Sequence, residues 1–428
     1  MKAAAAVVVP GDRSPATPAW RVETISDFNS FLDAEAAWND VVEAAGIDHP
    51  FLSHEWVRTW WESFGAGKEL HILVVKAGGE PVAIAPLMRS VGWMYGVRVR
   101  RLQFISNDHT PRCDFIIARR AGDAYRAIWR ALSREQGLWD VLELNQLQAG
   151  SRSLDELSRL AARDGFRIGL WRSAESPYVP LVGTWESYLK GLRSHHRANL
   201  RNRLKRLSRL GQVELEVVAP DERLGSALEA GLRLEAAAWK GEAGTAIRCH
   251  PAVHAFYTRL AERAARRGWL RLSFMAIGDR RIAFSYSLCY RNRLYLLKIG
   301  YDPEYAQYSP FNLLCDGVLR KAFAEGLAEC DFMGTKDKWK LEWTRETRPH
   351  YWLFLFPNAM GPRLIHWAKF QLVPRLQRHR LYLSLRDTVL RARGRTNGLT
   401  PPDRRTSGDG AGSQVATARP LIGGGEAP

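Results

Sequence analysis

Cysteine is scarce in this sequence. The chain has five, an odd number, and they are widely separated. No C-x-x-C pair occurs, which argues against the disulfide framework of a small secreted domain and against a zinc ribbon. His250 and His254 stand four residues apart, but no carboxylate completes a metal site beside them. We therefore expect a protein of the reducing cytoplasm that binds no metal.

Two further patterns are missing. No apolar run approaches the roughly 20 residues that span a bilayer, and no G-x-S-x-G motif indicates a Ser-His-Asp hydrolase. Acidic residues are outnumbered, since 45 Asp and Glu stand against 62 Lys and Arg, for a net charge of +17. This excess favours an anionic partner, such as a phosphate-bearing cofactor, a nucleic acid or a membrane surface. An arginine-rich composition would give the same value, so charge alone selects none of them.

An internal repeat is the strongest signal of organisation. "LVVKAGGEPVAIAPLM" (73–88) and "SFMAIGDRRIAFSYSL" (273–288) each contain an apolar strand, a Gly-centred turn and a second strand. Gly78 aligns with Gly278 and Ala83 with Ala283, without gaps. The repeat predicts two antiparallel hairpins and a tandem duplication of one unit in a mixed α/β (α+β) fold.

The length of 428 residues agrees with more than one domain. We expect a disordered leader over 1–19, one unit over 20–175 and a second over 176–360. The boundary is marked by the Ser- and Pro-containing stretch "RSAESPYVPL". Residues 361–394 read as a basic amphipathic helical segment broken at Pro374. Residues 395–428 have the composition of a disordered tail.

A cluster of tyrosines lies between a strand and a helix of the second unit. "NRLYLLKIGY" (292–301) reads as a buried strand and "FNLLCDGVLRKAFAEG" (311–326) as a helix that ends at Gly326. The loop between them contributes Tyr301, Tyr305 and Tyr308, then Ser309 as an N-cap and Pro310 at the first helical position. A helix N-terminus after a strand favours phosphate. A well-capped helix with half-buried tyrosines is the structural alternative.

The order of these elements resembles the acyl-CoA-binding half of the GNAT acyltransferases. The chain is more closely similar to the CelD/BcsL-type acetyltransferases associated with cellulose and exopolysaccharide biosynthesis. The stretches that carry this resemblance are "FLSHEWVRTWWESFG" (51–65), "LRSHHRANLRNRLKRLSRLG" (192–211), "LEAAAWKGEAGTAI" (234–247), "KIGYDPEYAQYSPFNLL" (298–314) and "CDFMGTKDKWKLEW" (330–343). Fem-type aminoacyltransferases share the tandem plan. The Gly-rich R/Q-x-x-G-x-G/A loop of simple GNATs is replaced by "YDPEYAQYSPFN", so the usual mode of pyrophosphate binding does not carry over to this chain.

The resemblance implies acetyl-CoA or another acyl-CoA as co-substrate and direct acyl transfer to an amine or hydroxyl. Such a transfer needs a polarised carbonyl, a base for the acceptor and an acid for the leaving thiolate. Glu235 is the preferred base, with Asp331 and Glu342 weaker; Asp331 could instead hold Lys336 or an arginine. The acid is one of the three tyrosines. Cofactor contacts are expected from five residues: Lys298, Gly300, Ser309, Phe311 and Asn312.

Acceptor contacts are expected from six residues: Trp239, Lys240, His109, Asp114, Lys336 and Trp343. His109 and Asp114 belong to the loop "NDHTPRCD" of the first unit, which is equivalent by the repeat to the loop that follows the strand in the second unit. Such a loop could line the cleft between the units, and a structural turn is the alternative. That loop lacks tyrosines, so we expect no cofactor site in the first unit.

A basic stretch precedes the second hairpin. Eight Lys and Arg residues fall between 190 and 209 without an acid, along a stripe of leucines with helical spacing. Like charges at this spacing destabilise an isolated helix, so an anion or a docked surface should compensate. Charged tRNA would suit a Fem-like aminoacyl transfer, whereas lipid headgroups at 190–209 and 364–394 would suit an inactive membrane-associated scaffold. A solvated helix face explains the stretch equally well.

Overall fold

We describe a computed structural model of the chain over residues 20–219, 223–237 and 244–376. The first half contains β1 (Trp20–Ile25), α1 (Phe28–Asp33), α2 (Glu35–Ala44), α3 (His54–Phe64), β2 (Glu69–Leu70), β3 (Ile72–Ala77), β4 (Glu80–Ala85), β5 (Leu87–Met94), β6 (Val97–Phe104), β7 (Ile116–Ile117), α4 (Ala121–Arg134), β8 (Val141–Gln148), α5 (Arg152–Arg163) and β9 (Arg167–Pro180). The second contains α6 (Trp185–Gly191), α7 (Ser194–Leu207), β10 (Val213–Val218), α8 (Leu224–Ala236), α10 (Pro251–Arg266), β11 (Leu270–Ile277), β12 (Arg280–Tyr290), β13 (Arg293–Tyr301), the 3-10 helix η3 (Pro303–Tyr308), α11 (Pro310–Ala324), β14 (Glu329–Asp331), β15 (Thr347–Phe356), α12 (Met360–Trp367), a π-helical turn (Ala368–Leu372) and α13 (Val373–Leu376).

The repeat is visible in the structure. β3–β4 and β11–β12 are antiparallel hairpins, and their glycine turns adopt positive φ at Gly78 and Gly278. Each hairpin has a register shift at the same place, after Val75 in the first and after Met275 in the second. A β-bulge at equivalent positions is a specific feature that chance would not reproduce. The predicted hairpins and the mixed α/β class are confirmed.

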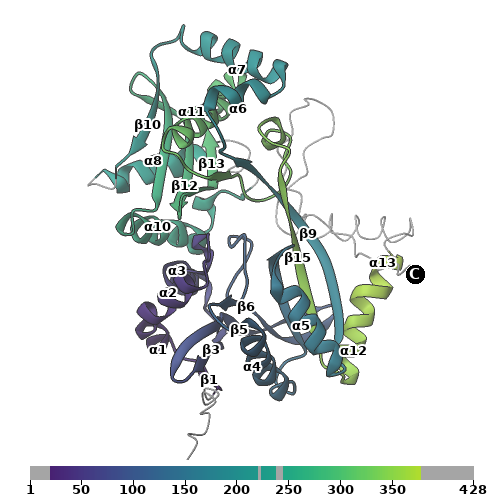
Figure 1. The fold of residues 1–428 in the computed structure, drawn as a ribbon. Helices are drawn as coiled ribbons and strands as arrows, with labels where there is room; N and C mark the ends of the chain where they lie inside the picture. The colour runs from purple at the N-terminus through teal and green to yellow at the C-terminus, as the bar shows by residue number, and fades with distance from the viewer. Residues whose placement is uncertain (1–19, 220–222, 238–243, 377–428) are drawn as a thin grey trace, which may run out of the picture.

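The two halves share strands. β9 runs beside β15 along most of its length (Figure 1). β9 also pairs with β14 at one end, and β15 also pairs with β8. An 11-stranded sheet therefore runs through both halves, in the order β10-β11-β12-β13-β14-β9-β15-β8-β6-β5-β2. A boundary at residue 175 falls inside β9, and β15, counted with the second unit, lies among strands of the first. The division into two units therefore describes the repeat, while the sheet is continuous.

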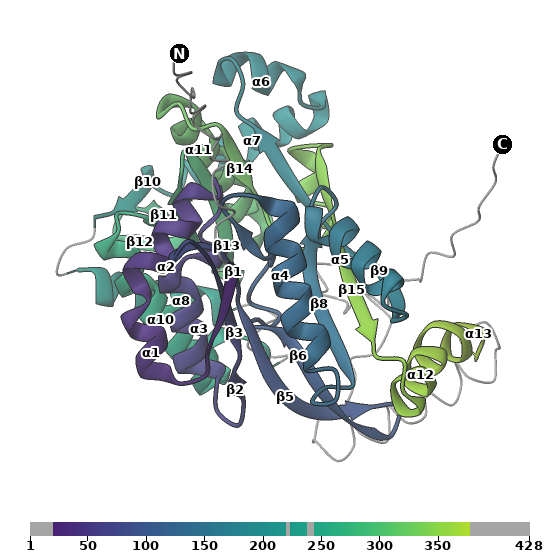
Figure 2. The same ribbon diagram turned by 60° about the horizontal axis from the view of Figure 1, so that its bottom comes forward.

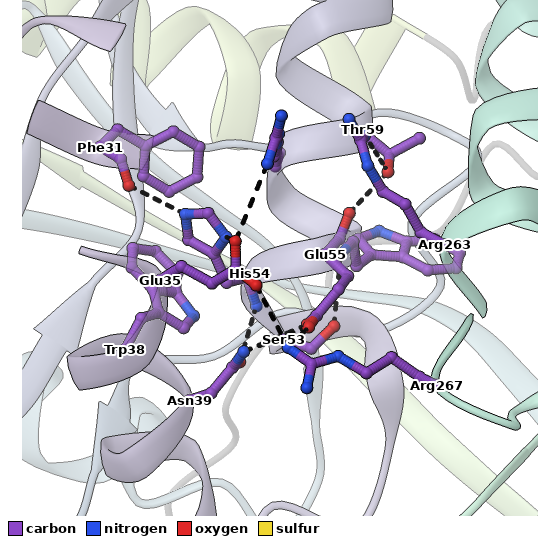
Figure 3. Close-up of polar contacts among 12 residues, drawn as sticks. Phe31, Glu35, Trp38, Asn39, Ser53, His54, Glu55, Thr59, Arg263 and Arg267 are labelled. Atoms are coloured by element: carbon purple, nitrogen blue, oxygen red, sulfur yellow. Dashed lines mark hydrogen bonds and ion pairs between the residues drawn. The ribbon is translucent and has the colours of Figure 1, made fainter. Parts of the chain in front are cut away.

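Equivalent helices of the repeat pack against each other at the junction. Trp56 of α3 meets Phe256 of α10 edge to face, at 5.4 Å between ring centroids. Both belong to one buried cluster that includes residues of both halves. Around it, Arg263 donates to Thr59 and Arg267 pairs with Glu55 (Figure 3). Apolar burial with a polar rim fixes α10 against α3.

The helix starts and ends predicted from the sequence agree in part with those in the structure. α11 begins at Pro310, and Gly326 follows its end with a φ of 67°. Ser309 precedes the helix as expected, but it is left-handed (φ 48°) and its side chain makes no capping bond. The single basic helix expected over 190–209 is two helices, because the chain turns at Leu192 and Arg193 between α6 and α7. The leader, the tail and most of the 361–394 segment lie outside the described residues.

Candidate active site

The edge of β13 is the centre of the candidate site. β13 pairs with β14 only at Arg293, Leu294 and Tyr295, after which no sheet partner continues on that side among the described residues. On its other side the register with β12 shifts, so that Leu297 has no opposite residue. A bulge of this kind re-aims backbone groups. Backbone donors at a strand edge can polarise a carbonyl.

The tyrosine loop continues directly from this edge. Tyr305 and Tyr308 lie on η3 with ring centroids 6.5 Å apart. Together with Tyr301 they are half-buried and pack against the apolar cluster beneath α11. In the described part of the chain, none of the three hydroxyls makes a hydrogen bond. The rings therefore pack as the structural alternative expected, while the hydroxyls remain available to a ligand.

Two arginines stack on these rings. Arg280 lies 5.1 Å from the Tyr305 ring centroid and Arg206 of α7 lies 5.2 Å from that of Tyr308. Arg280 is also bonded to Asp302 and Glu304, which together raise its pKa. Arg206 donates only to the side-chain oxygen of Gln307, at 3.3 Å, and has no acidic partner in the described structure. The basic helix α7 thus lies against the tyrosine loop and brings positive charge to it.

An open hollow of about 490 Å³ lies along α7. The side chains that line it are all polar or cationic: Asn199, Asn202, Arg203, Lys205, Arg206 and Arg209. Ion pairs to these cations are absent among the described residues. Cations gathered on one surface without acids among the described residues favour a ligand with phosphate groups.

The opposite face of β13 carries a second polar group. Lys298 lies 5.2 Å from the Tyr257 ring centroid, and the Tyr257 hydroxyl is 3.3 Å from Nδ1 of His109. His109 comes from the first half, so both halves contribute to this group. Burial, with the nearby charges of Lys298 and His250, lowers the pKa of His109 to about 4. His109 is therefore a neutral imidazole at neutral pH, able to accept or donate a hydrogen bond.

Glu235 belongs to the same side of the sheet. Its side chain is buried at the end of α8, and one carboxylate oxygen accepts a hydrogen bond from the backbone of Ile247 at 3.0 Å. Burial and the Glu235 charge raise the pKa of Tyr257. Gly300 packs under the same helix, because a Cβ there would lie 2.4 Å from the backbone nitrogen of Glu235. The glycine is thus explained by the approach of α8.

Asp331 lies at the junction as the centre of a buried ionic cluster. Its carboxylate pairs with Arg112 and with Arg348, and accepts from Ser176 and from the backbone of Met333. Arg348 also binds Glu329. These contacts favour the alternative stated for Asp331, in which it holds an arginine. Sequence reasoning did not single out Arg112 or Arg348; the only signal was the loop "NDHTPRCD", in which Arg112 lies.

Most other site residues that the sequence suggested lie apart from the tyrosine loop and from the group around His109. Asp114 accepts from Ser153 at the start of α5, Lys336 pairs with Glu175, and Trp343 is buried beside His196. Glu342 pairs with the same His196 at 3.1 Å. Phe311 is buried against Trp339, and Asn312 follows it in the first turn of α11. Trp239 and Lys240 lie outside the described residues.

Comparison with known proteins identifies the class. Residues 194–341 match the family model described as "Acetyltransferase (GNAT) domain". No curated protein matched the chain. The match covers α7, the tyrosine loop, β13 and β14. The predicted class, an acyltransferase of the GNAT type, is confirmed over this segment of the chain, which includes β13.

Several solved structures are similar to the chain at low identity. One is the C-terminal domain of a putative lysylphosphatidylglycerol synthetase from Agrobacterium fabrum (13% identity, 78% of this chain and 95% of that one, TM-score 0.47). Others are FemX (12%, 80% and 100%, TM-score 0.43) and a tandem GNAT protein from the clavulanic acid biosynthesis pathway (12%, 78% and 98%, TM-score 0.42). Likenesses at this level leave the acyl donor and the acceptor open.

Proposed function

We propose that the protein transfers an acyl group from acyl-CoA directly to an amine or hydroxyl. The observation that carries the proposal is the end of β13, where an unpaired edge, a bulge and the tyrosine loop meet. Among the described residues the hydroxyls of this loop make no hydrogen bond, and the neighbouring Arg206 has no acidic partner. A thioester carbonyl placed against the edge would be polarised by backbone N–H groups. The phosphate groups of CoA would lie toward the N-terminus of α11 and the cations of α7.

The residues on the two faces of β13 divide the proton transfers. Tyr305 or Tyr308 would protonate the leaving thiolate, with Tyr301 the third candidate for this role, since a positioned phenol is a competent acid. Glu235 would take the proton of the acceptor, from the side where His109 and Lys298 lie. Because His109 comes from the first half, the acceptor would lie where the two halves meet. No covalent enzyme intermediate is needed.

The acceptor follows from the resemblance alone. Similarity to the CelD/BcsL type favours an amine or hydroxyl of an envelope- or exopolysaccharide-related acceptor or of a small molecule. Lys298 and the neutral His109 are suited to hydrogen bonding with such polar groups.

Calorimetric titration with acetyl-CoA and with longer acyl-CoAs tests the proposal. We expect micromolar binding by the wild type, and binding weakened about tenfold in Tyr305→Phe or Tyr308→Phe, which corresponds to one lost hydrogen bond of about 1.4 kcal/mol. Tyr351→Phe, a half-buried tyrosine of β15, is the matched control and should bind as the wild type does. Absence of heat with every acyl-CoA would refute the proposal.

Transfer from charged tRNA is the second candidate, and the hollow along α7 is the observation that favours it. A tRNA contact with the α7 cations would lose affinity steeply as salt is raised, with a slope of roughly −0.7 to −0.9 per phosphate neutralised. Acyl-CoA binding that survives in the same salt range while tRNA binding is absent would eliminate this candidate.

A further inference from the structure

A β-hairpin of the first half exposes apolar and aromatic side chains at its tip. β5 and β6 are joined by a tight turn at Tyr95 and Gly96, both with positive φ. Trp93 is 70% exposed and Tyr95 48%, and Val91 and Val97 beside them are also exposed. Large apolar and aromatic side chains that are exposed together in one patch mark a surface for interaction.

Basic residues accompany this tip. Across the hairpin, Trp93 stands opposite Arg98 and Val91 opposite Arg100. Arg100 is paired with Asp140, whereas Arg98 has no ion pair within the described ranges. Residues 87–104 contain no Asp or Glu. The tip therefore combines aromatic, aliphatic and cationic groups without a single acid of its own.

A second exposed apolar stripe lies at the same end of the sheet. β5 ends, β6 and β8 begin and β15 ends at this edge, and α12 follows β15 there (Figure 2). Met94 and Val99 of the hairpin share a buried cluster with Ile365 of α12. On the opposite side of the helix, Met360, Leu364 and Trp367 form an exposed stripe, with Met360 at 79%. The helix is thus apolar on both faces, and the sheet covers only one of them.

We propose that the hairpin tip and α12 form a peripheral docking surface for an anionic lipid bilayer. Trp and Tyr concentrate at the interface between lipid and water, and flanking Arg and Lys contact acidic headgroups. No helix among the described residues is long and apolar enough to span a membrane, so contact is at the surface. The sequence from 347 to 386 contains no acid.

The composition of the surface argues against two other occupants, a second copy of this chain and a single-stranded RNA. A second copy joined through the same face would bring Arg98 close to its own equivalent, and like charges across an interface are destabilising. Single-stranded RNA is held by stacking on aromatic rings, whereas Val91, Val97, Met360 and Leu364 offer none. A lipid surface uses the aliphatic, aromatic and cationic groups together.

Sedimentation with vesicles tests this surface on the full-length protein. We compare vesicles of equal parts phosphatidylcholine and phosphatidylglycerol with vesicles of phosphatidylcholine alone. The wild type should partition at least about tenfold more strongly onto the anionic vesicles, because each basic residue near the surface contributes about 1 kcal/mol. Trp93→Ala with Tyr95→Ala, and separately Arg98→Glu, should each weaken partitioning about tenfold. Leu210→Ala with Val182→Ala removes exposed apolar side chains of the other half and should change nothing.

The outcomes separate this proposal from its alternatives and from the proposed activity. Absence of binding, or binding that the tip variants leave unchanged, overturns it. Binding that appears only after residues 377–428 are deleted would mean that this segment covers the surface, and would also overturn it. Acyl-CoA titration without vesicles should be unaffected by the tip variants, so a failure of either proposal is seen independently of the other.

Discussion

At the scale of single residues, the polar group at the junction is built from both halves of the chain. His109 reaches Tyr257 and Lys298 across the junction, and its ring stacks on Phe64 at 5.8 Å between centroids. The imidazole is held in a partly desolvated place next to a positive charge, both of which disfavour its protonation. The desolvation and the nearby positive charge that keep the imidazole neutral also make the stability of the fold sensitive to acid.

We predict that His109 contributes to a loss of stability below pH 6.5. The pKa is about 4 in the folded protein, against an ordinary value near 6.5, so the unfolded chain binds the additional proton between these values. Stability from this group is complete above pH 6.5 and falls as the pH is lowered toward 4. In urea denaturation at several pH values, His109→Gln should reduce the slope over this window by up to about 1.4 kcal/mol per pH unit. The exposed His195→Gln should keep the wild-type slope; an unchanged slope in His109→Gln would contradict the prediction.

The sequence identified some of these residues for sound physical reasons. The tyrosine loop was predictable because a strand, a turn and a Pro-initiated helix leave local signals, and His109 was found through the repeat. Tyr257 was not identified, because a tyrosine on an amphipathic helix has the pattern of a core residue. Only the tertiary structure shows that a lysine lies over its ring. Asp331 and Arg112 are 219 residues apart in the chain, and such pairing leaves no local trace.

At the scale of elements, the approach of α8 to β13 positions Glu235. α8 crosses β13 at Gly300, where the lack of a side chain allows the helix backbone to touch the strand. The sequence suggested a cofactor contact for this glycine, whereas the structure gives it a packing role. The distinction can be measured, because a packing role affects stability before it affects ligand binding.

Gly300→Ala should therefore destabilise the protein by about 2–3 kcal/mol, since its Cβ would overlap the backbone of α8 and force it to move. The free energy of unfolding in urea gives the measurement. Gly225→Ala is the matched control on α8 itself, where a Cβ would meet nothing within 4 Å, and it should be neutral or stabilising by up to about 1 kcal/mol. Normal stability with weakened acyl-CoA binding in Gly300→Ala would instead support the cofactor role.

At the scale of the whole molecule, the repeat is joined into one cooperative structure. β9 and β15 are adjacent strands of one continuous sheet, and one apolar cluster contains residues of both α3 and α10. The sequence could reveal the duplication, because the hairpins keep their pattern. It could not reveal that strands are shared, because β15 is an ordinary apolar strand whose partners lie some 170 to 210 residues earlier in the chain.

We predict a single unfolding transition for both halves. Tryptophan fluorescence, far-ultraviolet circular dichroism and calorimetry should give coincident curves, because neither half retains its sheet without the other. Arg112→Met should destabilise the protein in that one transition, by about 1–3 kcal/mol in the free energy of unfolding. It removes one charged partner of the fully buried Asp331 carboxylate and leaves Arg348 as the other. Two separate transitions in the wild type, or a variant that shifts only one of them, would show that the halves fold independently and that the acceptor site proposed at their junction is assembled afterwards.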